Sequence, residues 1–219
     1  MTAATLWARR TVEPHWQLGD LSTAGPDRTW LVGWDAQPND DGMPPLAGRA
    51  IARAMTDTAR VSFLRAGPGP AGTVQWAVGN DGDCIRATRP AGALGTIADR
   101  LRGRPGPVTL VCSRRADAVA TVFDDPAFPW WLQSQALLLS SPDAAPPDVA
   151  PEDALGLLDT DWAARAAALR GRGVLAVARP AVDGEALGLL ALDGAIAERL
   201  MASLAVQARA AGLAWSCTP

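Results

Sequence analysis

The residue types that most often carry catalysis are sparse in this sequence. His15 is the one histidine, so a nucleophile such as Cys84 or Cys112 would need it as the general base. The sequence contains no Gly-x-Ser-x-Gly elbow, and both cysteines lie in or at the ends of apolar segments. A histidine packed beside Trp16 is therefore favoured over a catalytic base. No catalytic residue is assigned.

Carboxylate pairs that could do acid–base chemistry occur at Asp124–Asp125 and at Asp159–Asp161. The first pair coincides with an expected helix end, and the second fits the start of a helix, where negative charge is stabilised. Separation along the sequence does not predict a glycosidase-type pair, because the distance between two carboxylates depends on folding. Helix capping is the favoured interpretation. An enzyme that uses His15 or paired carboxylates is the least favoured function.

Neither a metal nor a cofactor is predicted. One histidine and three widely spaced cysteines lack the close pairs of structural zinc sites. The loop 37–42 has part of a calcium-loop spacing, but Gln37 replaces the first aspartate ligand and Gly48 the closing glutamate. The segment 67–72 has the spacing Gly-x-Gly-x-x-Gly, yet it precedes an expected strand at Thr73 rather than a helix. A dinucleotide site is therefore not expected there.

Tryptophan is the most unusual feature of the composition, with nine against three phenylalanines and no tyrosine. Trp130 and Trp131 stand between prolines, and in an extended segment the two cannot both point inward. Exposed aromatic residues are typical of binding surfaces. The candidate binding residues are His15, Trp16, Trp34, Asp35, Trp130 and Trp131. The alternative, that these tryptophans only supply core volume, stays open.

The charge balance indicates which partners to expect. The net charge is −3, and the 20 basic residues, all arginine, are spread from Arg9 to Arg209 without a dense run. Nucleic acid and anionic membranes are therefore not expected as partners. Apolar runs such as 189–192 fall far short of the ~20 residues of a membrane span. The first ten residues lack a secretory pattern, and three scattered cysteines suit a reducing compartment, so we expect a cytoplasmic protein of bacterial type.

Hydrophobic periodicity predicts a mixture of strands and helices. Strands are expected over residues 29–34, 61–66, 73–78, 84–88, 107–112, 136–141, 173–178, 186–192 and 213–217. Helices are expected over 46–57 and 91–102, in a segment capped by Ser113 that runs to Phe123, and in a final helix capped by Asp193, with one or two helices between 152 and 170. The apolar stripe of that last helix is Ile196, Leu200, Met201, Leu204 and Ala208, and Gly212 ends it. The strand–helix–strand order over 107–141 predicts a parallel pair with a right-handed crossover.

The segments 73–112 and 174–217 share an order of hairpin, Asp-Gly turn, helix and strand. This order suggests a degenerate duplication of a ββαβ unit, which different strand pairings would contradict. The expected fold class is α/β or α+β, with mixed sheets and helices on at least one face. A linker rich in Pro and Asp, 142–151, is expected between an N-terminal lobe, 1–141, and a C-terminal lobe, 152–219, packed as one compact body.

Two function classes follow from these patterns. The leading hypothesis is a non-catalytic accessory or adaptor protein that acts through a protein–protein interface. Its partner would be another protein, and self-association is compatible with it. This hypothesis predicts an exposed apolar patch that includes Trp130 or Trp131. The alternative is a small-molecule-binding or sensory domain, which predicts an enclosed and mostly apolar pocket.

Overall fold

The structure is a computed structural model that describes residues 4–10, 29–35, 43–66, 85–88, 108–124, 135–143, 162–180 and 186–218. The strands are β1 (Thr5–Arg10), β2 (Thr29–Trp34), β3 (Arg60–Ala66), β4 (Ile85–Thr88), β5 (Val108–Ser113), β6 (Gln135–Ser140), β7 (Val174–Pro180), β8 (Ala186–Ala191) and β9 (Ala214–Thr218). The helices are α1 (Pro45–Thr58), α3 (Ala116–Phe123), α5 (Trp162–Gly171) and α6 (Gly194–Ala210). The expected helix over 91–102 and the expected strand over 73–78 lie outside the described residues.

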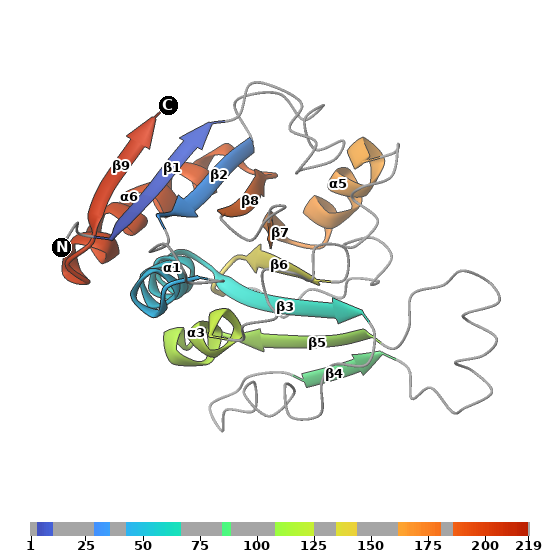
Figure 1. The fold of residues 1–219 in the computed structure, drawn as a ribbon. Helices are drawn as coiled ribbons and strands as arrows, with labels where there is room; N and C mark the ends of the chain where they lie inside the picture. The colour runs from blue at the N-terminus through green and yellow to red at the C-terminus, as the bar shows by residue number, and fades with distance from the viewer. Residues whose placement is uncertain are drawn as a thin grey trace.

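All the described strands belong to one nine-stranded sheet in the order β4-β5-β3-β6-β7-β8-β2-β1-β9 (Figure 1). β1 and β9 form its parallel pair, and the other neighbouring strands in this order pair antiparallel. A mixed sheet with helices confirms the predicted fold class of α/β or α+β.

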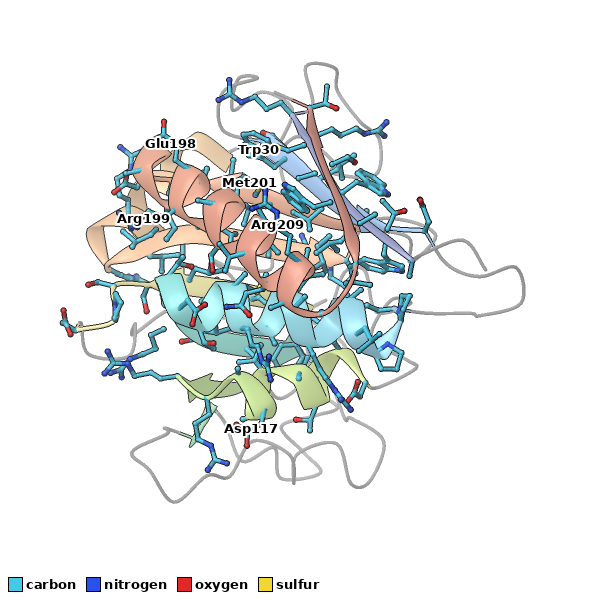
Figure 2. All side chains as sticks on the ribbon, turned by 90° about the vertical axis from the view of Figure 1, so that its left-hand side faces the viewer. Trp30, Asp117, Glu198, Arg199, Met201 and Arg209 are labelled. Carbon is cyan, nitrogen blue, oxygen red and sulfur yellow. The ribbon has the colours of Figure 1, made fainter. Side chains whose placement is uncertain are left out.

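Three helices cover one face of this sheet, with α1 between α6 and α3 (Figure 2). The side chains of β2 alternate as a strand requires, so Trp30, Val32 and Trp34 point into the core under these helices. Asp57 of α1 joins its neighbour α6, because Ser203 Oγ donates to its Oδ2 at 3.2 Å and Gln207 Nε2 at 2.8 Å. The fourth described helix, α5, contacts β7.

Local signals in the sequence account for α6. The Asp193 side chain accepts a hydrogen bond from the Ala195 N–H at 2.9 Å, which confirms the predicted N-cap. All five residues of the predicted apolar stripe are buried. Gly212 follows the helix with φ +73°, a left-handed conformation that favours glycine, so the predicted stop is also confirmed.

Two predictions around α3 are wrong. Ser113 is the last residue of β5 rather than an N-cap; Arg115 occupies the cap position and α3 begins at Ala116. The predicted parallel pair of β5 and β6 is absent, because β3 lies between them and pairs antiparallel with both. The two strands run in the same direction without being neighbours.

The duplication is not confirmed. In the first unit β4 pairs directly with the closing strand β5. In the second unit β8 pairs with β7 and β2, whereas the closing strand β9 pairs with β1. Equivalent strands therefore have different neighbours.

Strands from both predicted lobes share the sheet. β6 pairs with β7 across the predicted linker, and β2 pairs with β8. Most of 142–151 lies outside the described residues, so the division into lobes stays a prediction. No described helix has the length and apolarity needed to span a bilayer.

Candidate functional site

Trp34 and Asp35 are the predicted binding residues that the structure describes. The Trp34 side chain is 4% exposed and belongs to the core under the helix layer. Its indole Nε1 is buried and has no hydrogen-bond partner among the described residues. Asp35 is exposed, and its backbone N–H donates to the Thr5 carbonyl at 3.0 Å. His15, Trp16, Trp130 and Trp131, with the apolar patch predicted around the last two, lie outside the described residues.

An open groove lies elsewhere, between α1 and α3 on the outside of the helix layer. Its volume is about 490 Å³. The lining residues are Arg49 and Arg53 from α1, and Ala116, Asp117, Ala120, Thr121 and Asp124 from α3 and its C-terminal end. No binding role was predicted from the sequence for any of these residues.

Helical periodicity places these side chains along the groove. Arg49 and Arg53 are four residues apart on α1, opposite its buried row of alanines and Ile51. The two helices approach closely at Gly48, where a Cβ would lie 3.1 Å from the Phe123 Cβ. A side chain at position 48 would require Phe123 to move by a few tenths of an ångström.

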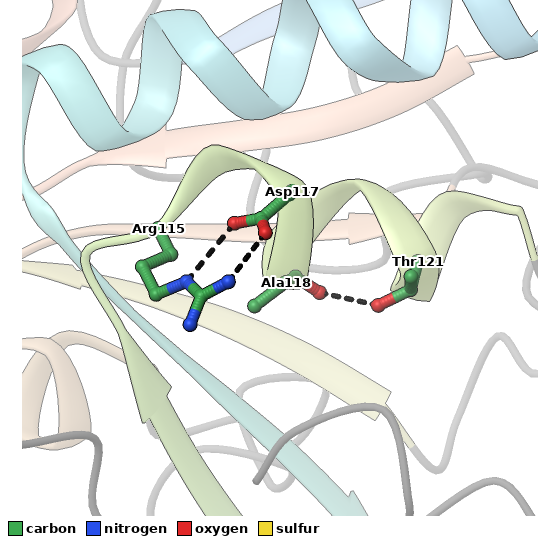
Figure 3. A network of polar contacts seen from close by, with 4 residues as sticks. All are labelled: Arg115, Asp117, Ala118 and Thr121. Carbon is green, nitrogen blue, oxygen red and sulfur yellow. Dashed lines mark hydrogen bonds and ion pairs between the residues drawn. The ribbon is translucent and has the colours of Figure 1, made fainter. Parts of the chain in front are cut away.

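The α3 wall carries a carboxylate that is already neutralised (Figure 3). Arg115 Nη2 donates to Asp117 Oδ2 at 2.6 Å and Arg115 Nε to Asp117 Oδ1 at 3.2 Å, a two-pronged contact. This hydrogen bonding lowers the pKa of the Asp117 carboxyl below its usual value. The Thr121 hydroxyl donates to the Ala118 carbonyl at 2.6 Å. The polar groups of Asp117 and Thr121 are thus engaged within α3 and its cap.

The α1 wall differs, because neither of its two arginine side chains has a polar partner in the described part of the chain. Arg49 and Arg53 are exposed, and neither guanidinium forms a hydrogen bond or ion pair within the described part of the chain. The exposed Asp124 carboxylate also makes no such contact there. Within the described residues, the groove therefore offers two guanidiniums without partners on one side and, on the other, the Asp124 carboxylate without a partner. These groups are suited to bind a molecule that carries complementary charges.

A buried arginine of the sheet, Arg179, was also not singled out from the sequence. Arg179 in β7 is 4% exposed and lies opposite Gly188 of β8. Burial lowers the pKa of its guanidinium to about 10, so it remains charged at neutral pH. A charge within the otherwise apolar strand 174–180 is the signal that could have found it. It lies in the sheet, apart from the groove.

Among the described residues no three His, Cys, Asp or Glu side chains gather as a metal site would require. No family model, no curated protein and no solved structure matches this chain.

Proposed function

We propose that this protein is a non-catalytic accessory or adaptor protein that binds another protein through the groove between α1 and α3. The observation that carries the proposal is the pair of exposed guanidiniums of Arg49 and Arg53, which have no hydrogen-bond or ion-pair partner in the described part of the chain and lie on the wall of a groove. Arginine binds carboxylates in a planar, two-pronged geometry and is enriched in protein interfaces.

The shape of the groove favours a protein segment over a small molecule. Small-molecule sites enclose most of their ligand, whereas the described residues around this groove enclose it only in part. Ala116 and Ala120 line it with small side chains, which leaves room for the side chains of a docked segment. The large apolar side chains exposed among the described residues, Leu46 and Val206, lie on different helices. Charge is therefore the main recognition feature.

The charges of the groove define the partner. A segment that binds here presents acidic side chains to Arg49 and Arg53 and a basic side chain to Asp124. Charges at the rim of an interface mainly set the association rate and the choice of partner. Binding should consequently weaken as ionic strength rises, because exposed charges are screened.

The test is affinity capture from the source cells with the wild-type chain and with an Arg49→Glu/Arg53→Glu variant. A matched control, Arg199→Glu/Arg209→Glu, makes the same charge change on α6, where both residues are exposed (labelled in Figure 2). We expect a stoichiometric partner with the wild type and the control, and its loss with the groove variant.

The capture experiment has outcomes that contradict the proposal. A partner retained by the groove variant, or lost equally from both variants, would mean that the groove is not the interface. Capture of no protein at all would contradict the adaptor function. A small acidic metabolite recovered in place of a protein would support the ligand-binding alternative. For a captured partner, reversing its acidic residues to arginine should restore binding to the groove variant.

A further inference from the structure

The strand β9 forms one edge of the sheet. It lies beside β1 at the outer end of the strand order, and no described strand pairs with its other side (Figure 1). Four of its five residues are exposed, and Trp215 is half-buried against the core. An edge strand offers a row of main-chain donors and acceptors to any strand that can reach it.

The register with β1 identifies which groups face outward. The Ala214 N–H donates to the Ala4 carbonyl at 3.1 Å, so the main-chain groups of Ala214 point toward β1. In a parallel ladder this direction alternates, and Ser216 and Thr218 also turn toward β1. Trp215 and Cys217 therefore direct their N–H and C=O groups away from the sheet.

The residues of β9 are not of the types that normally prevent strand pairing. Natural edge strands carry lysine or other charges, proline or a bulge. The residues of β9 are Ala, Trp, Ser, Cys and Thr, so none is charged and none is proline. Its register with β1 is continuous over all five residues.

We propose that β9 pairs antiparallel with β9 of a second copy of this chain, about a two-fold axis at Ser216. This register places Trp215 opposite Cys217 of the second copy, and the reverse. Both residues have outward main-chain groups, so each pair exchanges two N–H···O bonds. Ser216 then faces Ser216 of the second copy in the close, non-hydrogen-bonded position. One sheet would run continuously through both copies.

The charges near β9 agree with self-pairing. A neutral strand places no like charges opposite each other, which a charged strand paired with itself would do. The nearest charges belong to β1, where Arg9 lies beside Thr218 in the register and the charge of Arg10 acts on Cys217. In the antiparallel pair the Arg9 residues of the two copies fall at opposite ends, about 20 Å apart from strand spacings. At that distance salt screens their repulsion.

The first test measures mass by light scattering and sedimentation over a range of micromolar concentrations of the full chain. We expect a concentration-dependent dimer. Ser216→Asp should weaken dimerisation at least tenfold, because it places two carboxylates opposite each other at the axis. Thr218→Asp is the matched control and should dimerise normally, since Thr218 faces Ala214 of the second copy. An equimolar mixture of Ser216→Asp and Ser216→Arg should recover the dimer.

The second test fixes the register by disulfide formation in a Cys217→Ser background. Ser216→Cys should cross-link two copies, because close antiparallel pairs have Cα atoms about 4.5 Å apart, within disulfide range. Thr218→Cys should not, because its equivalents lie about 14 Å apart from strand spacings. The Cys217→Ser chain alone measures the background from other cysteines.

The inference is independent of the groove, so Arg49→Glu/Arg53→Glu should dimerise like the wild type. A chain that stays monomeric would overturn the inference. So would a Ser216→Asp variant that still dimerises, or equal cross-linking at positions 216 and 218. A monomer whose β9 captures a different protein would also overturn it, because the second copy is the proposed occupant.

Discussion

Replacing Gly33 by alanine tests a close contact within the sheet. Gly33 lies opposite Trp7 in the β1–β2 register, and the indole covers it. A Cβ at this position would lie 2.1 Å from Trp7 Cζ2 and 2.4 Å from Cε2, far inside van der Waals contact. The indole must therefore leave its position, where the Arg9 guanidinium lies 5.3 Å from its ring centroid.

The expected loss in free energy of unfolding follows from the contacts that the displaced Trp7 indole loses. If the displaced ring exposes about 100 Å² of apolar surface, half the area a buried aromatic covers, the cost is about 2.5 kcal/mol. Losing the contact with Arg9 adds about 0.5 kcal/mol at an exposed site. Replacing glycine by alanine also stabilises the folded state by about 0.5–1 kcal/mol, because alanine restricts the conformations of the unfolded chain. The net loss in free energy of unfolding is about 2 kcal/mol, which lowers Tm by about 4–8 °C in a chain of this size.

Urea unfolding of Gly33→Ala, followed by circular dichroism, measures this loss. The decisive comparison is a double-mutant cycle with Trp7→Ala, in which Gly33→Ala should become neutral or stabilising because no ring remains to be displaced. Gly194→Ala is the control, since nothing lies within 4 Å of its Cβ position, and should be neutral or slightly stabilising. Wild-type stability of Gly33→Ala, or the same loss in the Trp7→Ala background, would refute this account.

Three further predictions concern the helix layer. Asp193→Ala should lose about 1 kcal/mol and lower Tm by about 2–4 °C, whereas Asp193→Asn, which can still accept the capping bond, should lose much less in the same melting scan. Leu200→Ala should cost about 2–5 kcal/mol in urea unfolding, because this side chain is 1% exposed, whereas Val206→Ala at the 58% exposed position should change little. The pKa of Asp117, followed by NMR, should rise toward 3.8 in Arg115→Gln. Because folding lowers the pKa of Asp117, the ionised carboxylate stabilises the protein above its unfolded pKa, and this stabilisation disappears as the pH falls through the folded pKa. An Asp117→Asn variant should therefore have the same stability as the wild type only below the folded pKa.

The elements with strong local signals were predictable from the sequence. For α6 a capping aspartate, an apolar stripe and a terminal glycine all act within a few residues, and each prediction was confirmed. The β7–β8 hairpin also follows from two apolar runs separated by a short turn. Strand neighbours were less predictable, because pairing depends on segments that are distant in the chain. Nothing near β5 or β6 in the sequence indicates that β3 inserts between them.

The groove could not be predicted from periodicity alone. Arg49 and Arg53 lie outside the apolar stripe of α1, which is also where any solvated arginine on a helix would lie. Their significance depends on α3 packing beside α1, and the strands β3, β4 and β5 separate these two helices along the chain. The burial of Trp34 could not be predicted from the residues around it in the sequence either. It depends on the position of β2 as an inner strand of the sheet and on the helix layer that covers it.

The parallel pairing of β1 with β9 also has a consequence for the order of folding. It joins residues 5–9 to residues 214–218, among the most distant contacts in the described chain, so loop closure delays it relative to the local hairpins. Until β9 docks, β1 is the edge of the sheet, and β1 carries Arg9 and Arg10. A nascent or partly opened molecule therefore presents a charged edge that resists association with other chains. The neutral edge is presented only once the C-terminal strand is in place, which would restrict pairing between copies to folded molecules.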